Sequence, residues 1–83
     1  MRVTIRLFAR LRDIAGAAEL HREVDDGATL RALWQALVAE FKEFERYTGS
    51  ISGAINEEYA RMDARITDGD EVAFLPPVSG GAQ

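Results

Sequence analysis

One stretch of the chain carries apolar residues at helical spacing, and it constrains the rest of the architecture. Between Thr29 and Phe41 the apolar positions follow the spacing i, i+3, i+4, i+7, i+8 and i+11; they are Leu30, Leu33, Trp34, Leu37, Val38 and Phe41. The pattern predicts one amphipathic helix of about three to four turns, with Thr29 as its N-cap. Such a stripe must be buried against a second layer, and a chain of 83 residues has room for a single core.

The segments on both sides of this helix carry strand signals. Val3, Ile5 and Leu7 alternate with polar residues, which is the period of a half-buried strand. Further strands are expected at residues 19–24, 51–55, 59–62 and 71–75. Residues 8–15 are expected to form a short helical turn, whereas the polar residues 42–50 are predicted to be helix end and loop.

This order of elements predicts an α+β fold of the β-grasp type, with a mixed four- to five-stranded sheet and one main helix. Residues 1–75 would form the domain and residues 76–83 an extended, flexible tail. Pro76 and Pro77 stop the sheet because proline cannot donate to a ladder, and the residues after them have no apolar period. Fully extended, the six residues from Pro76 to Gly81 reach about 20 Å beyond the sheet.

The composition excludes most side-chain chemistry. The chain has no cysteine, so it has no disulfide, thiolate metal site or thiol nucleophile, and its one histidine allows neither a two-histidine metal site nor a histidine triad. His21 is expected on the outer face of a strand, and we assign it no role. A net charge of −4 argues against nucleic acid as a partner. No apolar run is long enough to span a membrane and no signal peptide is apparent, which favours a cytoplasmic protein.

Two apolar residues are expected on the face of the sheet away from the helix. If Val72 and Phe74 belong to the core, period 2 places Leu75 on the other face, immediately before the tail. Phe8 likewise departs from the parity of the first strand. Ordinary partial burial would explain both residues, but an apolar patch beside a projecting tail also fits a protein-docking surface.

The last residues resemble a known family. The run from Thr67 through Asp68-Gly69-Asp70 and Leu75-Pro76-Pro77 to Gly80-Gly81 is similar to the C-terminal signature of the small subunit of molybdopterin synthase, a ubiquitin-like sulfur carrier. The opening from Val3 to Gly16 and the Ala54-Ile55-Asn56 turn also resemble this family. A thiamine-pathway sulfur carrier shares the fold and the Gly-Gly end but typically lacks the two prolines, and it ranks second.

The resemblance implies a mechanism in which the chain is a non-catalytic sulfur-donor subunit. An E1-like enzyme that uses ATP would adenylate the carboxylate of Gly81, which then becomes a thiocarboxylate, and Gly80 would let the tail thread a narrow channel. Pro76, Pro77, Val78 and Ser79 would form the arm that enters the large synthase subunit, while Phe8 and Leu75 would provide the apolar docking surface. The partners would supply the catalytic groups, and no metal or cofactor would be bound.

Ala82 and Gln83 depart from the family pattern, in which the chain ends at the second glycine. In this sequence the Gly81 carbonyl is part of a peptide amide, which cannot be adenylated. Three explanations are open. A processing protease trims the last two residues, the chain is a paralogue that retains only the fold, or the two residues are foreign to the natural chain. We favour trimming. A ubiquitin-like modifier that forms isopeptide bonds through Gly81 would use the same activated tail. A self-sufficient enzyme is disfavoured because the sequence contains no nucleophile–base pair.

Overall fold

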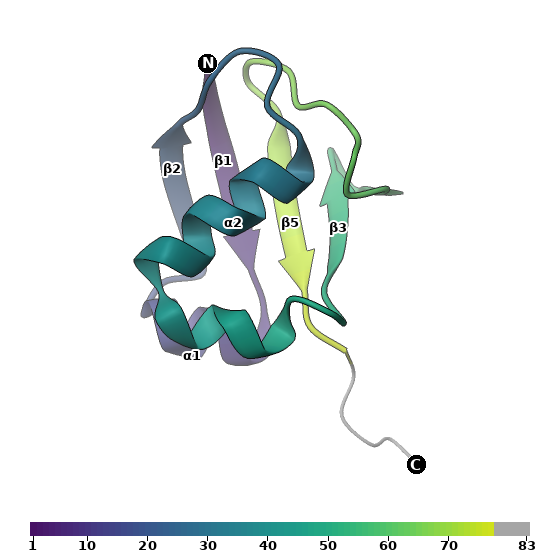
Figure 1. Cartoon of the computed structure of the whole chain (residues 1–83). Coiled ribbons are helices and arrows are strands. Elements are labelled where there is room, and N and C mark those ends of the chain that lie inside the picture. Colours follow the sequence, from purple (N-terminus) through teal and green to yellow (C-terminus); the bar gives the residue numbers. More distant parts are fainter. Residues whose placement is uncertain (78–83) are drawn as a thin grey trace.

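Five strands form one mixed sheet in the computed structural model, which describes residues 1–77 (Figure 1). The strands are β1 (Arg2–Leu7), β2 (Glu19–Glu23), β3 (Ser52–Ile55), β4 (Glu58–Ala60) and β5 (Glu71–Leu75). The helical elements are α1 (Ala9–Ala15), α2 (Leu30–Glu40) and the 3₁₀-helix η1 (Lys42–Tyr47). Their order along the chain confirms the β-grasp prediction.

The strands lie in the order β2-β1-β5-β3-β4. The neighbouring strands β1 and β5 are parallel, although they come from opposite ends of the described chain, and the other pairs are antiparallel. A parallel pair needs a crossover connection, and α2 lies within the connecting segment and covers one face of the sheet (Figure 1). The sheet is therefore mixed, as predicted, and none of the helices within residues 1–77 covers its other face.

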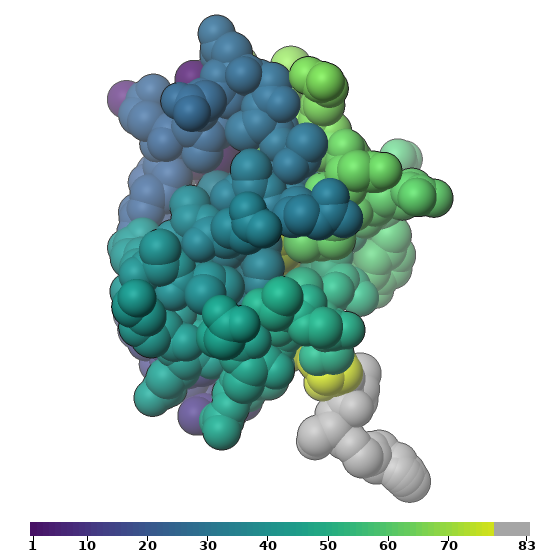
Figure 2. Space-filling model, viewed as in Figure 1, coloured from purple at the N-terminus to yellow at the C-terminus, as the bar shows by residue number. Residues whose placement is uncertain are grey.

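The predicted amphipathic helix forms and buries the expected residues. Its N-cap is Thr29, whose Oγ1 accepts a hydrogen bond from the Ala32 amide at 3.1 Å. Leu30, Leu33, Trp34 and Leu37 of α2 are buried. The Trp34 ring is stacked on Phe44 with 5.3 Å between the ring centroids, and lies 5.1 Å from Phe74 of β5. Figure 2 shows α2 and η1 closing over this face of the sheet.

The prediction that residues 42–50 are a helix end and a loop misses a separate element in its first part. Residues 42–47 form η1, and Phe44 at its centre is fully buried. Phe41, Phe44 and Tyr47 are spaced by three residues, which places them on one side of a 3₁₀-helix. The element closes the end of the core below α2, where it packs against α1.

Smaller differences concern the ends of elements. The first helix ends at Gly16 with φ of 75°, as its glycine predicts. β4 comprises only three residues and ends before Met62, so this edge of the sheet is shorter than predicted. The predicted tail over residues 76–83 lies outside the described residues, apart from Pro76 and Pro77.

Candidate functional site

The face of the sheet opposite α2 combines a polar half and an apolar half. Strand alternation directs Val72 and Phe74 into the core, where both are fully buried, and directs Glu71, Ala73 and Leu75 to the open face. On β1 and β2 the open-face residues are polar or charged: Arg2, Thr4, Arg6, Glu19, His21 and Glu23. On β5, β3 and β4 they are mainly apolar.

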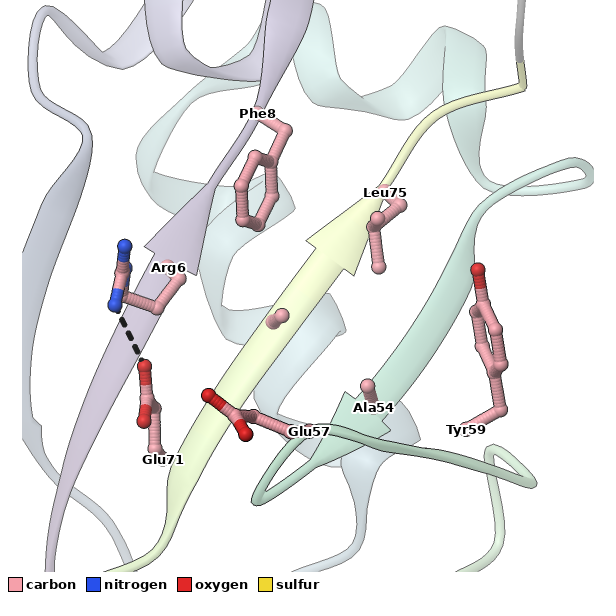
Figure 3. Close-up of a pocket in the computed structure, with 8 residues that line it drawn as sticks. Arg6, Phe8, Ala54, Glu57, Tyr59, Glu71 and Leu75 are labelled. Atoms are coloured by element: carbon pink, nitrogen blue, oxygen red, sulfur yellow. Dashed lines mark hydrogen bonds and ion pairs between the residues drawn. The ribbon is translucent and has the colours of Figure 1, made fainter.

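The apolar half forms a depression beside the end of β5. Its lining includes Phe8, Ala54, Tyr59, Ala73 and Leu75, and it encloses about 280 Å³ (Figure 3). Phe8 is 38% exposed and Tyr59 is 79% exposed, and within residues 1–77 they are the exposed large apolar side chains. A small domain whose exposed aromatic residues gather on one surface is suited to binding another protein there.

Phe8 reaches this surface because it continues the alternation of β1 by one residue. It is extended, with φ of −129° and ψ of 156°, and it precedes α1 as the N-cap residue. Leu7 before it points into the core, so Phe8 points to the opposite face (Figure 3). Ala9 then adopts a positive φ of 53°, and the chain turns into the helix.

A second hollow of about 500 Å³ lies where the chain leaves β5. Phe8 and Leu75 line it together with Tyr47, Pro76 and Pro77. Because Phe8 and Leu75 line both hollows, they form one apolar strip that runs from the open face to Pro76 and Pro77, where the predicted arm would begin. We call this surface, made by Phe8, Tyr59, Leu75 and Pro76, the docking strip.

Charged side chains border the depression at the end away from the arm. Arg6 Nη1 lies 2.8 Å from Glu71 Oε2. Glu57 also lines the depression, and Figure 3 shows its side chain pointing across β5 between Glu71 and Ala54. Within residues 1–77 no cation lies within ion-pair distance of the Glu57 carboxylate.

The turn that carries Glu57 has an unusual conformation. Asn56 and Glu57 have positive φ values of 52° and 71°, and they connect the pair Ile55–Glu58 that closes the β3–β4 hairpin. Two successive left-handed residues are typical of a type I′ turn, whose second position favours glycine. A side chain in this conformation costs on the order of 1–2 kcal/mol. The chain therefore keeps a glutamate where glycine would be favoured on conformational grounds.

The one histidine of the chain lies on the polar half of the open face. His21 is exposed, with Nε2 3.0 Å from Glu19 Oε2 and Nδ1 3.4 Å from the Thr4 hydroxyl, as expected for a surface residue. Residues 1–77 contain no cluster of metal-ligating side chains that could hold an ion. Among the same residues, no helix has the length and apolar character needed to cross a bilayer.

The structure brings together those predicted site residues that it describes. Phe8, Leu75, Pro76 and Pro77 all line the hollow at the start of the arm. Val78, Ser79, Gly80 and Gly81 lie outside the described residues. Tyr59 is a member of the docking strip that was not predicted from the sequence, although its cross-strand pairing with Ala54 follows from the register of a two-residue hairpin.

Comparisons with known proteins cover almost the whole chain. Residues 5–81 match the model of the ThiS family. The molybdopterin synthase sulfur carrier subunit of Arabidopsis thaliana is 34% identical over 79 residues, covering 95% of this chain and 82% of the plant protein. The corresponding subunit of Escherichia coli is 33% identical over 81 residues, covering 95% of this chain and 99% of the bacterial one.

Solved structures agree with this similarity. The crystal structure of SAMP1 from Haloferax volcanii superposes with a TM-score of 0.84 and 34% identity, covering 98% of this chain and all of that chain. A chain in the complex of subunits 1 and 2 of the molybdopterin-converting factor of Helicobacter pylori has a TM-score of 0.68 and 26% identity, with 98% and 100% coverage. The similarity thus extends to proteins whose names indicate two uses of the fold, sulfur carriage and protein modification.

Proposed function

The chain belongs to the ThiS family, and from this membership we propose that it is the sulfur carrier subunit of a molybdopterin synthase in the cytoplasm. The observation that carries the proposal is the docking strip at the start of the arm, on a chain that is similar to such subunits over nearly its full length. A carrier whose partners hold the catalytic groups needs two features: a surface that binds the partner and an arm that starts beside that surface.

The proposed chemistry takes place at Gly81. An E1-like enzyme joins the Gly81 carboxylate to the α-phosphate of ATP, releasing pyrophosphate, because a free carboxylate has no adequate leaving group. A sulfur donor then displaces AMP and leaves a thiocarboxylate, whose sulfur is passed to a pterin precursor in the large synthase subunit. The carrier binds no cofactor of its own. Ala82 and Gln83 must first be removed, since the Gly81 carbonyl is otherwise held in an amide.

The docking strip and the arm have different roles in the proposed function. Phe8, Leu75, Pro76 and Pro77 fix the carrier on its partner, and Val78 and Ser79 extend the arm toward the reacting group. Gly80 and Gly81 have no Cβ, so they fit a channel too narrow for larger residues. Positioning the reacting carbon within a partner's site is worth several orders of magnitude in rate, which explains how a carrier without catalytic side chains can react efficiently.

The experiment compares the 83-residue chain with the chain ending at Gly81. ATP–pyrophosphate exchange and intact mass are measured with an activating enzyme and a sulfur donor. The shorter form should gain the mass of one sulfur replacing one oxygen, and the 83-residue form should not react until a protease removes the last two residues. Direct activation of the 83-residue form at Gln83 would exclude Gly81 as the sulfur site, and inertness of both forms would exclude the carrier function.

A protein modifier is the second candidate, and it has a specific basis. Small archaeal modifier protein 1 of Haloferax volcanii is 33% identical over 84 residues, covering 92% of this chain and 97% of the archaeal protein. An activated Gly81 would then form an isopeptide bond with a target lysine. Mass spectrometry of the protein from its own cells separates the two functions, because a modifier gives adducts with other proteins and a carrier gives a thiocarboxylate.

A further inference from the structure

The depression on the open face has an uncompensated negative charge. Three charged side chains line it: Arg6, Glu57 and Glu71. The Arg6–Glu71 ion pair at 2.8 Å neutralises two of them, so one charge, that of Glu57, is left over. The Glu57 carboxylate is exposed, and its side chain points over the depression (Figure 3). A partner that covers this surface must either solvate that carboxylate or pair with it.

The position of Glu57 is set by the fold. The preceding residue, Asn56, is held on the start of β5 by three hydrogen bonds. Its amide donates to the Glu71 carbonyl at 2.7 Å, its Nδ2 donates to Asp70 Oδ1 at 3.0 Å, and its Oδ1 accepts from the Glu71 amide at 3.0 Å. The β3–β4 turn is therefore fixed relative to β5, and Glu57 is placed at the end of the depression opposite the arm.

We propose that Glu57 is a specificity-determining residue that receives an arginine or lysine side chain of the partner protein. An apolar side chain next to that cation would fill the depression between Phe8, Tyr59 and Leu75. This inference rests on the proposed function, since it assumes that the docking strip is where the partner binds. Charge complementarity carries it: an apolar surface that ends in one unpaired carboxylate excludes a wholly apolar or acidic partner, because burying an unpaired charge is unfavourable.

The pairing would also determine the direction of docking. The residues of the strip are apolar, and its two ends differ in charge: Glu57 lies unpaired at one end, whereas Arg10, which lines the hollow at the other end, is paired with Asp13. A partner with a matching cation at one end of its own apolar patch can therefore bind in one orientation, with the arm directed to a defined place. Apolar contacts alone do not distinguish the two ends, because the hydrophobic effect is not directional. Glu57 thus supplies the orientation and the aromatic residues supply contact area.

The test uses calorimetric binding to the large synthase subunit of the same organism. Glu57→Gln removes the charge and keeps the size, and Glu58→Gln is the matched control. Glu58 is also exposed, but strand alternation directs it to the face opposite Tyr59. Each variant is measured in the 83-residue chain and in the chain ending at Gly81, at low and at high salt. Circular dichroism melts verify that the variants fold.

Glu57→Gln should weaken binding by about tenfold at low salt and reduce its dependence on salt. Glu58→Gln should stay within about twofold of the original protein, because an exposed charge outside the contact contributes little. The specific pairing would be overturned if Glu57→Gln bound as tightly as the unsubstituted protein, or if Glu57→Gln and Glu58→Gln lost the same amount of affinity.

The failure of the proposed function would look different. Leu75→Glu should abolish binding whether or not Glu57 is paired, since it places a charge at the centre of the strip. If Leu75→Glu binds normally, or if neither form of the unsubstituted protein binds, the docking strip itself is not the binding surface. If Leu75→Glu loses binding and Glu57→Gln binds fully, the docking strip is the binding surface but Glu57 has no role in it.

Discussion

Replacing Trp34 by alanine tests the packing of the core most directly. The Trp34 side chain is 2% exposed and lies between the rings of Phe44 and Phe74, at centroid distances of 5.3 and 5.1 Å. It therefore connects three elements, α2, η1 and β5. The neighbouring aromatic rings are themselves fully buried, so they have little freedom to collapse into the space that the indole would leave.

The expected cost follows from these contacts. Truncation of a buried tryptophan to alanine costs about 3–5 kcal/mol, and incomplete relaxation around the cavity favours the upper part of that range. The lost hydrogen bond from Trp34 Nε1 to the Thr48 hydroxyl, 3.1 Å long, adds little because Thr48 is exposed and water can replace its partner. A domain of 83 residues has a total stability of about 4–12 kcal/mol, so the variant should be close to unfolding at 25 °C.

Urea unfolding followed by far-ultraviolet circular dichroism measures this loss. With a slope of about 1–2 kcal/mol per molar urea, a loss of 4 kcal/mol lowers the midpoint by roughly 2–4 M. Trp34→Phe is the companion variant, which retains an aromatic ring and should cost about 1–2 kcal/mol, so a measurable transition is kept even if Trp34→Ala does not fold. A loss below about 1 kcal/mol for Trp34→Ala would refute the assignment of Trp34 to the core.

Three further outcomes are expected. Gly53→Ala should destabilise the fold by about 1–2 kcal/mol in urea unfolding, because its Cβ would meet Leu30 Cδ1 at 3.0 Å; unchanged stability would mean that Leu30 moves freely. Leu75→Glu should keep stability within about 1 kcal/mol, since the side chain is on the open face, and a larger loss would place it in the core. Glu57→Gly should stabilise by about 1 kcal/mol in thermal unfolding by relieving the left-handed backbone, and destabilisation would contradict the strain assigned to this turn.

The helix and the sheet could be predicted because their signals are local and periodic. The α2 stripe repeats over three turns, and the alternation in β1 and β5 decides which side chains enter the core, so Leu75 could be assigned to the open face from sequence parity. The same rule predicts that Phe8 lies on the open face, because its position alternates with those of the buried residues of β1. Periodicity gives the face of an element reliably when the pattern extends over several residues.

The missed features depend on contacts between distant segments. Lys42–Tyr47 is polar at four of six positions, and its identity as η1 depends on Phe44 packing on Trp34, which a search for helical or strand periods does not reveal. A spacing of three from Phe41 to Phe44 to Tyr47 was the available signal. Nothing in the sequence pattern distinguishes Glu57 from other turn carboxylates, because the left-handed turn and its attachment to β5 arise only from the assembled sheet. Sequence composition alone cannot indicate which surface a turn residue faces.

The two faces of β5 explain how one small domain separates stability from binding. In β5, Val72 and Phe74 are completely buried and anchor the strand between β1 and β3. Ala73 and Leu75 of the same strand point to the open face. Pro76, where the proposed arm begins, is two residues after the anchored Phe74 and is therefore held close to the core. Substitutions on the open face can change which partner is bound without loss of the fold, because they remove few buried contacts. A change at Phe74 instead should affect stability and the position of the arm together, since the same strand carries both.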